Sequence, residues 1–368
     1  MGAGKELKNI VKVMRQGLSL REPIASSAFL WPAGQWAPTL RATRRVLIIF
    51  FVLIPSAFSF IGAGIVAAEK TEKIRAGFFS NITHAQAMVG QANGFWDQKL
   101  GKGAVEWTVF NAGPSVIEAM FANHLDIAYV GPSPAVNGYV KSNGEVVRIL
   151  AGAASGGAAL VVREDAGIQL AQDFHGKKIT SPQFGNTQDV ALRSWLLSQN
   201  LKIREKGGDV DVLPVANADQ LSLFSKKEID ASWSVEPWVS IYLKQGGTKI
   251  FMEESSLWPK GRYATTVVIV RKKFLDQHPE QVRNFLRAHR ELTDWINGHP
   301  KESKELFNNQ FEKFMRRKMD PTILDMAWKR VVFTTDQMRE SVLAQAQNAY
   351  QVGFLKKKPD LKDLFLNF

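Results

Sequence analysis

Short apolar runs and amphipathic stretches alternate along the chain from residue 73 onward. Runs rich in β-branched and aromatic residues predict strands at residues 73–79, 105–110, 126–130, 146–151, 158–162, 177–180, 211–215, 230–233, 249–252 and 265–270. Apolar positions at helical spacing predict helices at residues 84–93, 114–123, 187–199, 217–227 and 237–245, and one that starts at Pro134. This alternation is typical of an α/β fold built on doubly wound, mostly parallel sheets.

Beyond residue 270 the pattern is that of helices alone. One face of a long helix there carries Val282, Phe285, Leu286, Leu292 and Ile296. No Pro-, Gly- or Ser-rich linker divides the chain, and no internal repeat is visible. We therefore expect two lobes joined by crossing strands, rather than two domains in series.

Residues 44–68 have the pattern of an export signal. Two arginines lead into an apolar stretch that ends in small residues at Val66, Ala67 and Ala68, which predicts cleavage after Ala68 and a periplasmic protein. The run from residue 46 to residue 68 carries no charge, so an uncleaved membrane anchor is the alternative. Residues 1–43 are too many for an ordinary signal and are interpreted as an N-terminal extension or a misassigned start.

Composition excludes several classes of protein. The chain has 45% hydrophobic and 22% charged residues, which is ordinary for a globular protein, and no cysteine, which excludes disulfides, thiolate metal sites and a lipid-modified cysteine. Half of the net charge of +12 lies in residues 1–68, where eight Lys and Arg residues accompany two Glu residues. The basic residues are not interleaved with aromatic ones, so we expect no nucleic-acid partner.

Five polar loops follow predicted strands, at residues 80–84, 111–115, 131–134, 154–157 and 181–189. Ligands of open α/β sheets bind outside the carboxyl ends of the strands, and helix N-termini present N–H groups to anions. Each loop taken alone is explained as well by helix capping, because capping favours Ser, Thr and Asn. Five such loops on one expected edge, from two lobes, favour an anion site.

Catalytic and metal-binding patterns are missing from the sequence. His84 lies in one of the five loops, but the other histidines are scattered, at positions 124, 175, 278, 289 and 299. Ser155 lies in no G-x-S-x-G motif, and residues 152–157 do not form a P-loop. We expect neither a metal, nor a cofactor, nor an enzyme.

Two tryptophans flank residues 234–237. Trp233 or Trp238 at the ligand edge could form the wall of a site for an organic ligand, and Glu236 could accept a hydrogen bond or latch the lobes together. The alternative is that both rings belong to the core and that Glu236 and Pro237 only begin a helix. The sequence leaves both readings open.

Six motifs, in this order and spacing, resemble the nitrate/sulfonate/taurine family of periplasmic solute-binding proteins, which feed ABC importers and share their domain with thiamine-pyrimidine precursor proteins. They are GFFSNITHA (77–85), DIAYVGPSP (126–134), GKKI (176–179), GNTQD (185–189), DASW (230–233) and EPW (236–238). The resemblance covers about residues 73–296. It implies a type II, two-lobe binding fold with two crossover strands, which here would place residues 69–168 and 262–368 in one lobe and 169–261 in the other.

The resemblance also implies a small anionic ligand, most readily an organic sulfonate, held by N–H groups and hydroxyls of both lobes. Its partner would be an inner-membrane permease with a cytoplasmic ATPase, and the binding protein would be a monomer. Carried over to this chain, the candidate ligand-binding residues are Asn81, His84, Ser133, Ser155, Gly156, Asn186, Thr187, Gln188, Glu236 and Trp238. Among these, Ser133, Ser155 and Thr187 are the strongest candidates.

Two alternatives and the choice of ligand stay open at this point. The same fold could serve a pyrimidine-precursor enzyme or a membrane-tethered ligand sensor, although the enzymes of the family use a cysteine-rich segment that this chain lacks. A sulfonate, a sulfate ester, nitrate and a pyrimidine are all compatible with the motifs. The loops contain no obvious arginine, which favours a singly charged anion, and Trp238 favours an organic tail.

Overall fold

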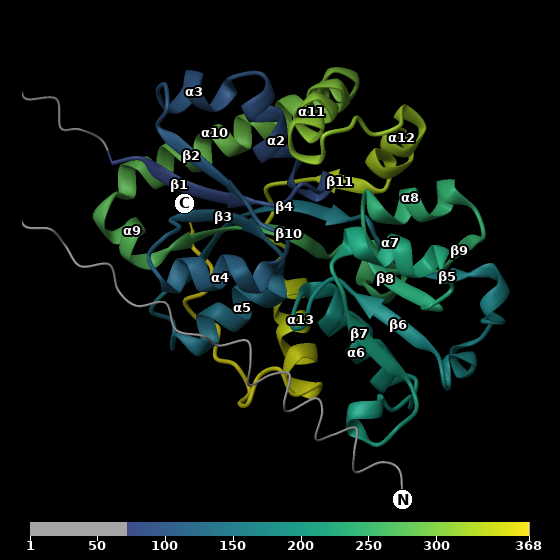
Figure 1. Cartoon of the computed structure of the whole chain (residues 1–368). Coiled ribbons are helices and arrows are strands. Elements are labelled where there is room, and N and C mark those ends of the chain that lie inside the picture. Colours follow the sequence, from purple (N-terminus) through teal and green to yellow (C-terminus); the bar gives the residue numbers. More distant parts are fainter. Residues whose placement is uncertain (1–71, 368) are drawn as a thin grey trace, which may run out of the picture. The chain divides into compact units, whose positions relative to one another are not determined.

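Two β-sheets organise the chain between residues 72 and 367, the residues that the computed structural model describes. The strand order is β11-β4-β10-β3-β1-β2 in one sheet and β7-β6-β8-β5-β9 in the other. Each sheet is the centre of one lobe, called here the first and the second lobe (Figure 1). Both lobes belong to one compact unit of the chain.

The first lobe is a six-stranded sheet with helices on both faces. Its strands are β1 (Ile74–Phe78), β2 (Val105–Val109), β3 (Ile127–Val130), β4 (Val147–Gly156), β10 (Ala264–Arg271) and β11 (Val331–Phe333). The residues of β3 and β10 are all buried, as expected of central strands that are covered on both faces.

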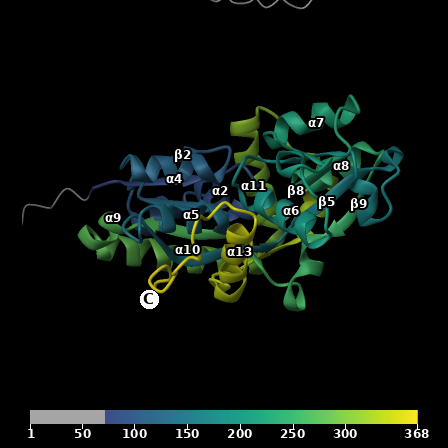
Figure 2. The same cartoon turned by 90° about the horizontal axis from the view of Figure 1, so that it is seen from below.

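Helices cover both faces of this sheet (Figures 1 and 2), and an apolar cluster lies on each face. One includes residues of α2 (Ala85–Ala92), α3 (Phe95–Leu100), α10 (Pro279–Gly298), α11 (Pro300–Met315) and α12 (Pro321–Lys329). The other includes residues of α4 (Gly113–Phe121), α5 (Pro132–Lys141) and α13 (Arg339–Gln351). The apolar face predicted for the long helix is buried in α10, while α9 (Lys272–Gln277) links β10 to it.

The second lobe repeats this layered plan on a smaller scale. Its strands are β5 (Ala158–Arg163), β6 (Lys178–Ser181), β7 (Asp211–Pro214), β8 (Ala231–Val235) and β9 (Thr248–Glu253). One apolar cluster lies between the sheet and α6 (Thr187–Ser198), and a second one lies between the sheet, α7 (Asn217–Ser225) and α8 (Trp238–Gln245).

The sheets are mixed, so the expectation of mostly parallel sheets was wrong. In the first sheet β1 pairs in parallel with β2 and β3, but β10 pairs antiparallel with β3 and β4, and β11 with β4. In the second sheet β6 pairs in parallel with β7 and β8, whereas β5 pairs antiparallel with β8 and β9. The reversed strands are β10 and β11 in the first sheet and β5 in the second. The physical reason for β5 and β10 is that each enters its sheet directly from the other lobe, at the end of the sheet where the parallel strands finish.

The chain passes twice between the two sheets. Strand β4 pairs in the first sheet, and β5, which follows Gly157, pairs in the second. The chain returns from β9 to β10 through η5 (Glu254–Leu257) and η6 (Pro259–Gly261).

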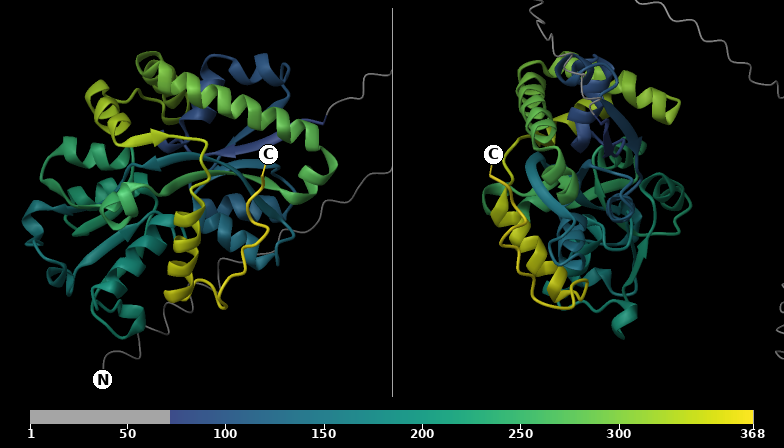
Figure 3. Two further views of the ribbon diagram at one scale, coloured as in Figure 1. Left: turned by 180° about the vertical axis from the view of Figure 1, so that it is seen from behind. Right: turned by 90° about the vertical axis from the view of Figure 1, so that its left-hand side faces the viewer.

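The C-terminal part of the chain contacts both lobes. Helix α13 packs against α5 of the first lobe and α6 of the second, and α12 packs against α8 (Figure 3). The strand β11 corrects the expectation that only helices follow residue 270. Its three residues are too few for a visible alternation, and they become a strand by pairing with β4.

The predicted signal or anchor at residues 44–68 and the extension at residues 1–43 lie outside the described residues. Within residues 72–367, no helix is long and apolar enough to cross a membrane.

Candidate functional site

A small cavity of about 20 Å³ lies where loops of the two lobes meet. First-lobe elements contribute Phe79, Asn81, Thr83, His84, Asn111, Gly131, Thr265 and Thr266, and second-lobe elements contribute Pro182, Asn186, Gln188, Asn217 and Val235. The lining, taken over residues 72–367, is polar but contains no Lys, Arg, Asp or Glu. In the same part of the chain, no three His, Asp or Glu side chains are grouped for a metal ion.

Helix starts surround this cavity. Its lining includes Gly131 and Asn186, the N-cap residues of α5 and α6, and Asn217, the first residue of α7. Asn81, just before η1 (Ile82–His84), and Asn111, in the loop before α4, also line the cavity. The positive ends of several helix dipoles therefore gather around a cavity without charged side chains, which is a favourable environment for an anion.

His84 is held as a neutral hydrogen-bond donor. Its Nδ1 accepts a hydrogen bond from the backbone N–H of Phe79 at 3.2 Å. Burial lowers the pKa of His84 to about 3, so the ring is neutral at physiological pH. A neutral ring with an accepting Nδ1 carries its proton on Nε2. Since no described group accepts a hydrogen bond from Nε2, the ring can offer this proton to a ligand.

Ser133 and Thr187 meet across the interface between the lobes. The backbone nitrogen of Ser133, in the first turn of α5, lies 3.4 Å from Oγ1 of Thr187, the first residue of α6. Both side chains are buried, and Oγ of Ser133 has no hydrogen-bond partner within the described structure. Neither residue is the N-cap of its helix, so capping explains neither of them.

The loop before α6 is shaped by an internal hydrogen-bond network. Oδ1 of Asn186 accepts a bond from the N–H of Gln188 at 3.1 Å, which makes Asn186 the N-cap of α6. The buried carboxylate of Asp189 accepts bonds from Oγ of Ser181 at 2.8 Å and from the N–H of Gly185 at 2.9 Å. The loop is therefore folded tightly against the start of the helix, and it brings Asn186 and Gln188 to the cavity wall.

Trp238 and Glu236 lie beside the cavity rather than in its wall. Nε1 of Trp238 donates a hydrogen bond to Oδ1 of Asn81 at 3.3 Å, and this bond joins the two lobes. Glu236 is fully buried and forms an ion pair with Arg330 of the first lobe, with Nε and Oε1 2.5 Å apart. Burial raises the pKa of Glu236 to about 7, against the opposing effect of Arg330.

Ser155 and Gly156 lie at the end of β4, where the chain leaves the first lobe, and do not line the cavity. Oγ of Ser155 accepts a bond from the N–H of Tyr263 on the returning crossing at 3.3 Å. The carbonyl of Gly156 accepts a bond from Oγ1 of Thr265 at 2.7 Å. These contacts join the two crossings, so the structure places both residues where the chain passes between the lobes.

Sequence reasoning missed several residues of the cavity wall. Asn111 lies in a loop that was singled out without being named as a candidate, and Thr83 directly precedes His84. Asn217 begins a predicted helix, which was a usable signal. Thr265 and Thr266 lie near the start of β10, and only the pairing of β10 with β4 brings them to the other loops of the cavity.

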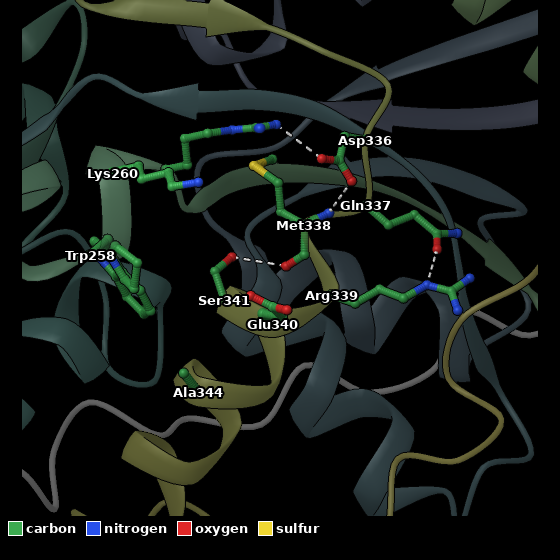
Figure 4. A pocket seen from close by; sticks show the side chains of 11 residues that line it. Trp258, Lys260, Asp336, Gln337, Met338, Arg339, Glu340, Ser341 and Ala344 are labelled. Atoms are coloured by element: carbon green, nitrogen blue, oxygen red, sulfur yellow. Dashed lines mark hydrogen bonds and ion pairs between the residues drawn. The ribbon is translucent and has the colours of Figure 1, made fainter.

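A larger hollow of about 560 Å³ lies where the returning crossing meets the start of α13 (Figure 4). Two pairs of its polar side chains bond to each other: Arg262 with Asp336 at 3.0 Å, and Nε of Arg339 with Oε1 of Gln337 at 2.8 Å. It contains none of the sequence-predicted site residues. The small cavity between the lobes is therefore the candidate site.

Comparisons with known proteins agree with this architecture. The chain is 24% identical over 325 residues to a Bacillus subtilis (strain 168) protein provisionally named an aliphatic sulfonates-binding protein, covering 86% of this chain and 93% of the relative. It is 26% identical over 205 residues to the taurine-binding periplasmic protein of Escherichia coli (strain K12), covering 55% of this chain and 60% of the relative.

Solved structures show the same fold. The alkanesulfonate-binding protein SsuA from Xanthomonas axonopodis pv. citri, bound to MOPS, superposes with a TM-score of 0.67 at 16% identity, covering 82% of this chain and 99% of the other. The nitrate-binding protein NrtA from Synechocystis PCC 6803 gives 0.61 at 15% identity, covering 78% and 83%. These likenesses confirm the predicted periplasmic binding protein fold. The model of the NMT1-like family matches residues 67–308, and the chain therefore belongs to that family.

Proposed function

We propose that this chain is the solute-binding component of an ABC importer and captures an organic sulfonate in the cavity between its lobes. One observation carries the proposal: a cavity without charged side chains, walled by both lobes and surrounded by helix starts. Relatives named for aliphatic sulfonates and for taurine support the choice of ligand. They are binding proteins, so no chemical turnover is proposed.

The donors suit a singly charged oxyanion. A sulfonate spreads one negative charge over three oxygens, so it needs several hydrogen-bond donors but no paired cation. Nε2–H of His84, the amides of Asn81, Asn186 and Gln188 and the hydroxyls of Ser133 and Thr187 would supply them. Oδ1 of Asn81 already accepts from Trp238, which leaves the amide nitrogen of Asn81 to donate.

The unpartnered oxygen of Ser133 supports the same assignment. Buried polar atoms in native proteins nearly always have a hydrogen-bond partner. Oγ of Ser133 has none in the described structure. A bound oxyanion would give the Ser133 hydroxyl an acceptor.

Capture requires the lobes to separate and close again. The cavity is about 20 Å³ in volume, enough for about one water molecule and less than a sulfonate needs. The two crossings, at Gly157 and at residues 254–263, are the places where the chain can bend. The bonds between Trp238 and Asn81, and between Arg330 and Glu253 at 2.6 Å, would hold the closed form.

The remaining parts of the proposal follow from this role. The first lobe would comprise residues 72–156 and 264–367, and the second lobe residues 158–253, with the crossings between them. The protein would be exported to the periplasm as a monomer. There it would deliver its ligand to a membrane permease driven by a cytoplasmic ATPase.

Thermal unfolding of the purified protein tests the ligand class. Methanesulfonate, taurine, a sulfate ester, nitrate and a pyrimidine are added separately, and each melting curve is compared with that of the unliganded protein. A sulfonate at 100 times its Kd should stabilise the fold by about 2.7 kcal/mol. Stabilisation by nitrate or by the pyrimidine alone would contradict the proposal.

Small-angle scattering then tests the mechanism. With a saturating amount of the sulfonate that stabilises the fold, the radius of gyration should be smaller than without it. An unchanged radius of gyration at proven saturation would argue against closure.

A further inference from the structure

A further hollow, called here the α6–α13 pocket, lies away from the candidate site. It has a volume of about 320 Å³ and lies where the second half of α6 and the segment after it face the end of α13. Helices α6 and α13 are in contact, so the pocket has walls from both lobes (Figure 1). It shares no lining residue with the cavity between the lobes.

The apolar part of the lining comes from both lobes. Leu197, Leu201 and Ile203 of the second lobe line the pocket together with Val352 of the first. Leu197 is 53% exposed, although the other two leucines of α6, at positions 192 and 196, are fully buried. An apolar group bound in the pocket would remove this surface from water, which is favourable.

The charged residues that line the pocket are all cations. Lys202 and Lys206 are exposed, and neither forms an ion pair within residues 72–367. The third cation, Arg193, is buried and already bonds to Asp189 at 3.1 Å and to Glu205 at 2.9 Å. In the same part of the chain, no Asp or Glu lines the pocket. Two unpaired ammonium groups therefore lie beside an apolar surface.

We propose that the α6–α13 pocket is a second ligand site, and that it binds a small carboxylate with an apolar chain. The two lysines would attract the carboxylate, and the chain would cover the leucine, isoleucine and valine side chains. The volume lies at the lower end of the range of small-molecule sites, about 300–1,000 Å³, which suits a single short chain. Such a ligand would contact both lobes.

Calorimetric titration of the purified protein with octanoate, acetate and octylammonium tests the proposal. Octanoate has both features of the expected ligand, acetate lacks the chain, and octylammonium has the opposite charge. Each buried methylene group should strengthen affinity by about fourfold, so octanoate should bind at least tenfold more tightly than acetate. It should bind severalfold more tightly than octylammonium, because the two lysines repel a cation. Octanoate that binds no more tightly than either of the others would overturn the proposal.

Substitutions locate the octanoate. Leu197→Gln and Lys202→Glu change exposed side chains of the pocket, so the fold should be retained and octanoate affinity should fall severalfold in each. The matched controls are Leu343→Gln, at a 46% exposed position of α13, and Lys226→Glu, at the exposed end of α7, both outside the pocket. Both controls should bind octanoate as the parent protein does. An equal loss in the controls, or unchanged affinity in both pocket variants, would overturn the assignment.

Ser133→Ala separates this pocket from the cavity between the lobes. Ser133 does not line the α6–α13 pocket, so the variant should bind octanoate with unchanged affinity. A loss of octanoate affinity in Ser133→Ala would place the carboxylate in the other site and overturn the proposal.

Discussion

The backbone nitrogen of Ser133 lies 3.4 Å from Oγ1 of Thr187, although the two residues begin helices in different lobes. The approach is close because residue 131, just before α5, is a glycine. A Cβ atom there would come within 2.2 Å of Oγ1 of Thr187. The contact between the lobes at the cavity therefore depends on the lack of a side chain at Gly131.

Gly131→Ala should prevent full closure. The backbone of Gly131 is extended with φ of −67°, so alanine fits locally and each lobe should still fold. The added methyl would meet Thr187 only when the lobes come together. We expect sulfonate affinity to fall more than tenfold, and the liganded protein to keep the larger radius of gyration of the open form in small-angle scattering.

Gly298→Ala is the control for this prediction. An alanine Cβ at position 298 meets no atom within 4 Å. The control should bind as tightly as the parent protein. A Gly131→Ala protein that binds and contracts normally would show that the lobes close with a different relative position.

Ser133→Ala should weaken binding without weakening the fold. Oγ of Ser133 has no protein partner, so its removal breaks no bond of the unliganded protein. A hydrogen bond to a charged ligand contributes about 1.5–3 kcal/mol, so affinity should fall roughly 10- to 100-fold. Calorimetric titration and thermal melting separate the two effects. Unchanged affinity would remove Ser133 from the site.

His84 should remain neutral throughout the range from pH 5 to pH 8. Burial lowers its pKa to about 3, whereas an unfolded chain has the ordinary value near 6.5. Between these values the unfolded state binds the extra proton, so the free energy of unfolding falls as pH is lowered through this window and is fully retained above it. Nitrogen NMR of the ring should show the Nε2–H tautomer at pH 5. A ring that protonates between pH 5 and pH 8 would contradict its role as a neutral donor.

Glu254→Gln should stabilise the protein in alkaline but not in acidic solution. Glu254 is buried in the returning crossing, where Nε1 of Trp233 donates a hydrogen bond to its Oε2 at 2.7 Å. Burial raises its pKa to about 7 from 4.5. The folded state therefore binds more protons than the unfolded one in this window, and the free energy of unfolding falls as pH rises from 4.5 to 7.

Glutamine keeps the acceptor for Trp233 but does not ionise. The variant should gain about 3 kcal/mol over the parent protein at pH 8, relative to the difference at pH 4.5. Urea unfolding of both proteins at these two pH values measures this change. An equal difference at both pH values would mean that Glu254 is not titrating in this window.

The local pattern of hydrophobic and polar residues was sufficient to predict most helices and strands and part of the candidate site. The run of β-branched residues at 265–270 lies within β10, and the helix predicted at 187–199 is α6. Asn81, His84, Asn186 and Gln188, four of the ten candidates, line the cavity. Helix caps and strand ends are local features, and in parallel strands they gather on one edge of a sheet, so their meeting could be anticipated.

The sequence by itself therefore determined the α/β class, most strands and helices, and the polar loops that could hold an anion. The tertiary structure alone decided where the chain crosses between lobes, that Val331–Phe333 pairs with β4, and that Ser155 and Gly156 bond to the returning crossing. It also decided that Arg330 faces Glu236 and that Thr265 and Thr266 reach the cavity. The physical reason is that periodicity along a chain reports which residues are buried, whereas the partner of a buried residue depends on packing between segments far apart in sequence.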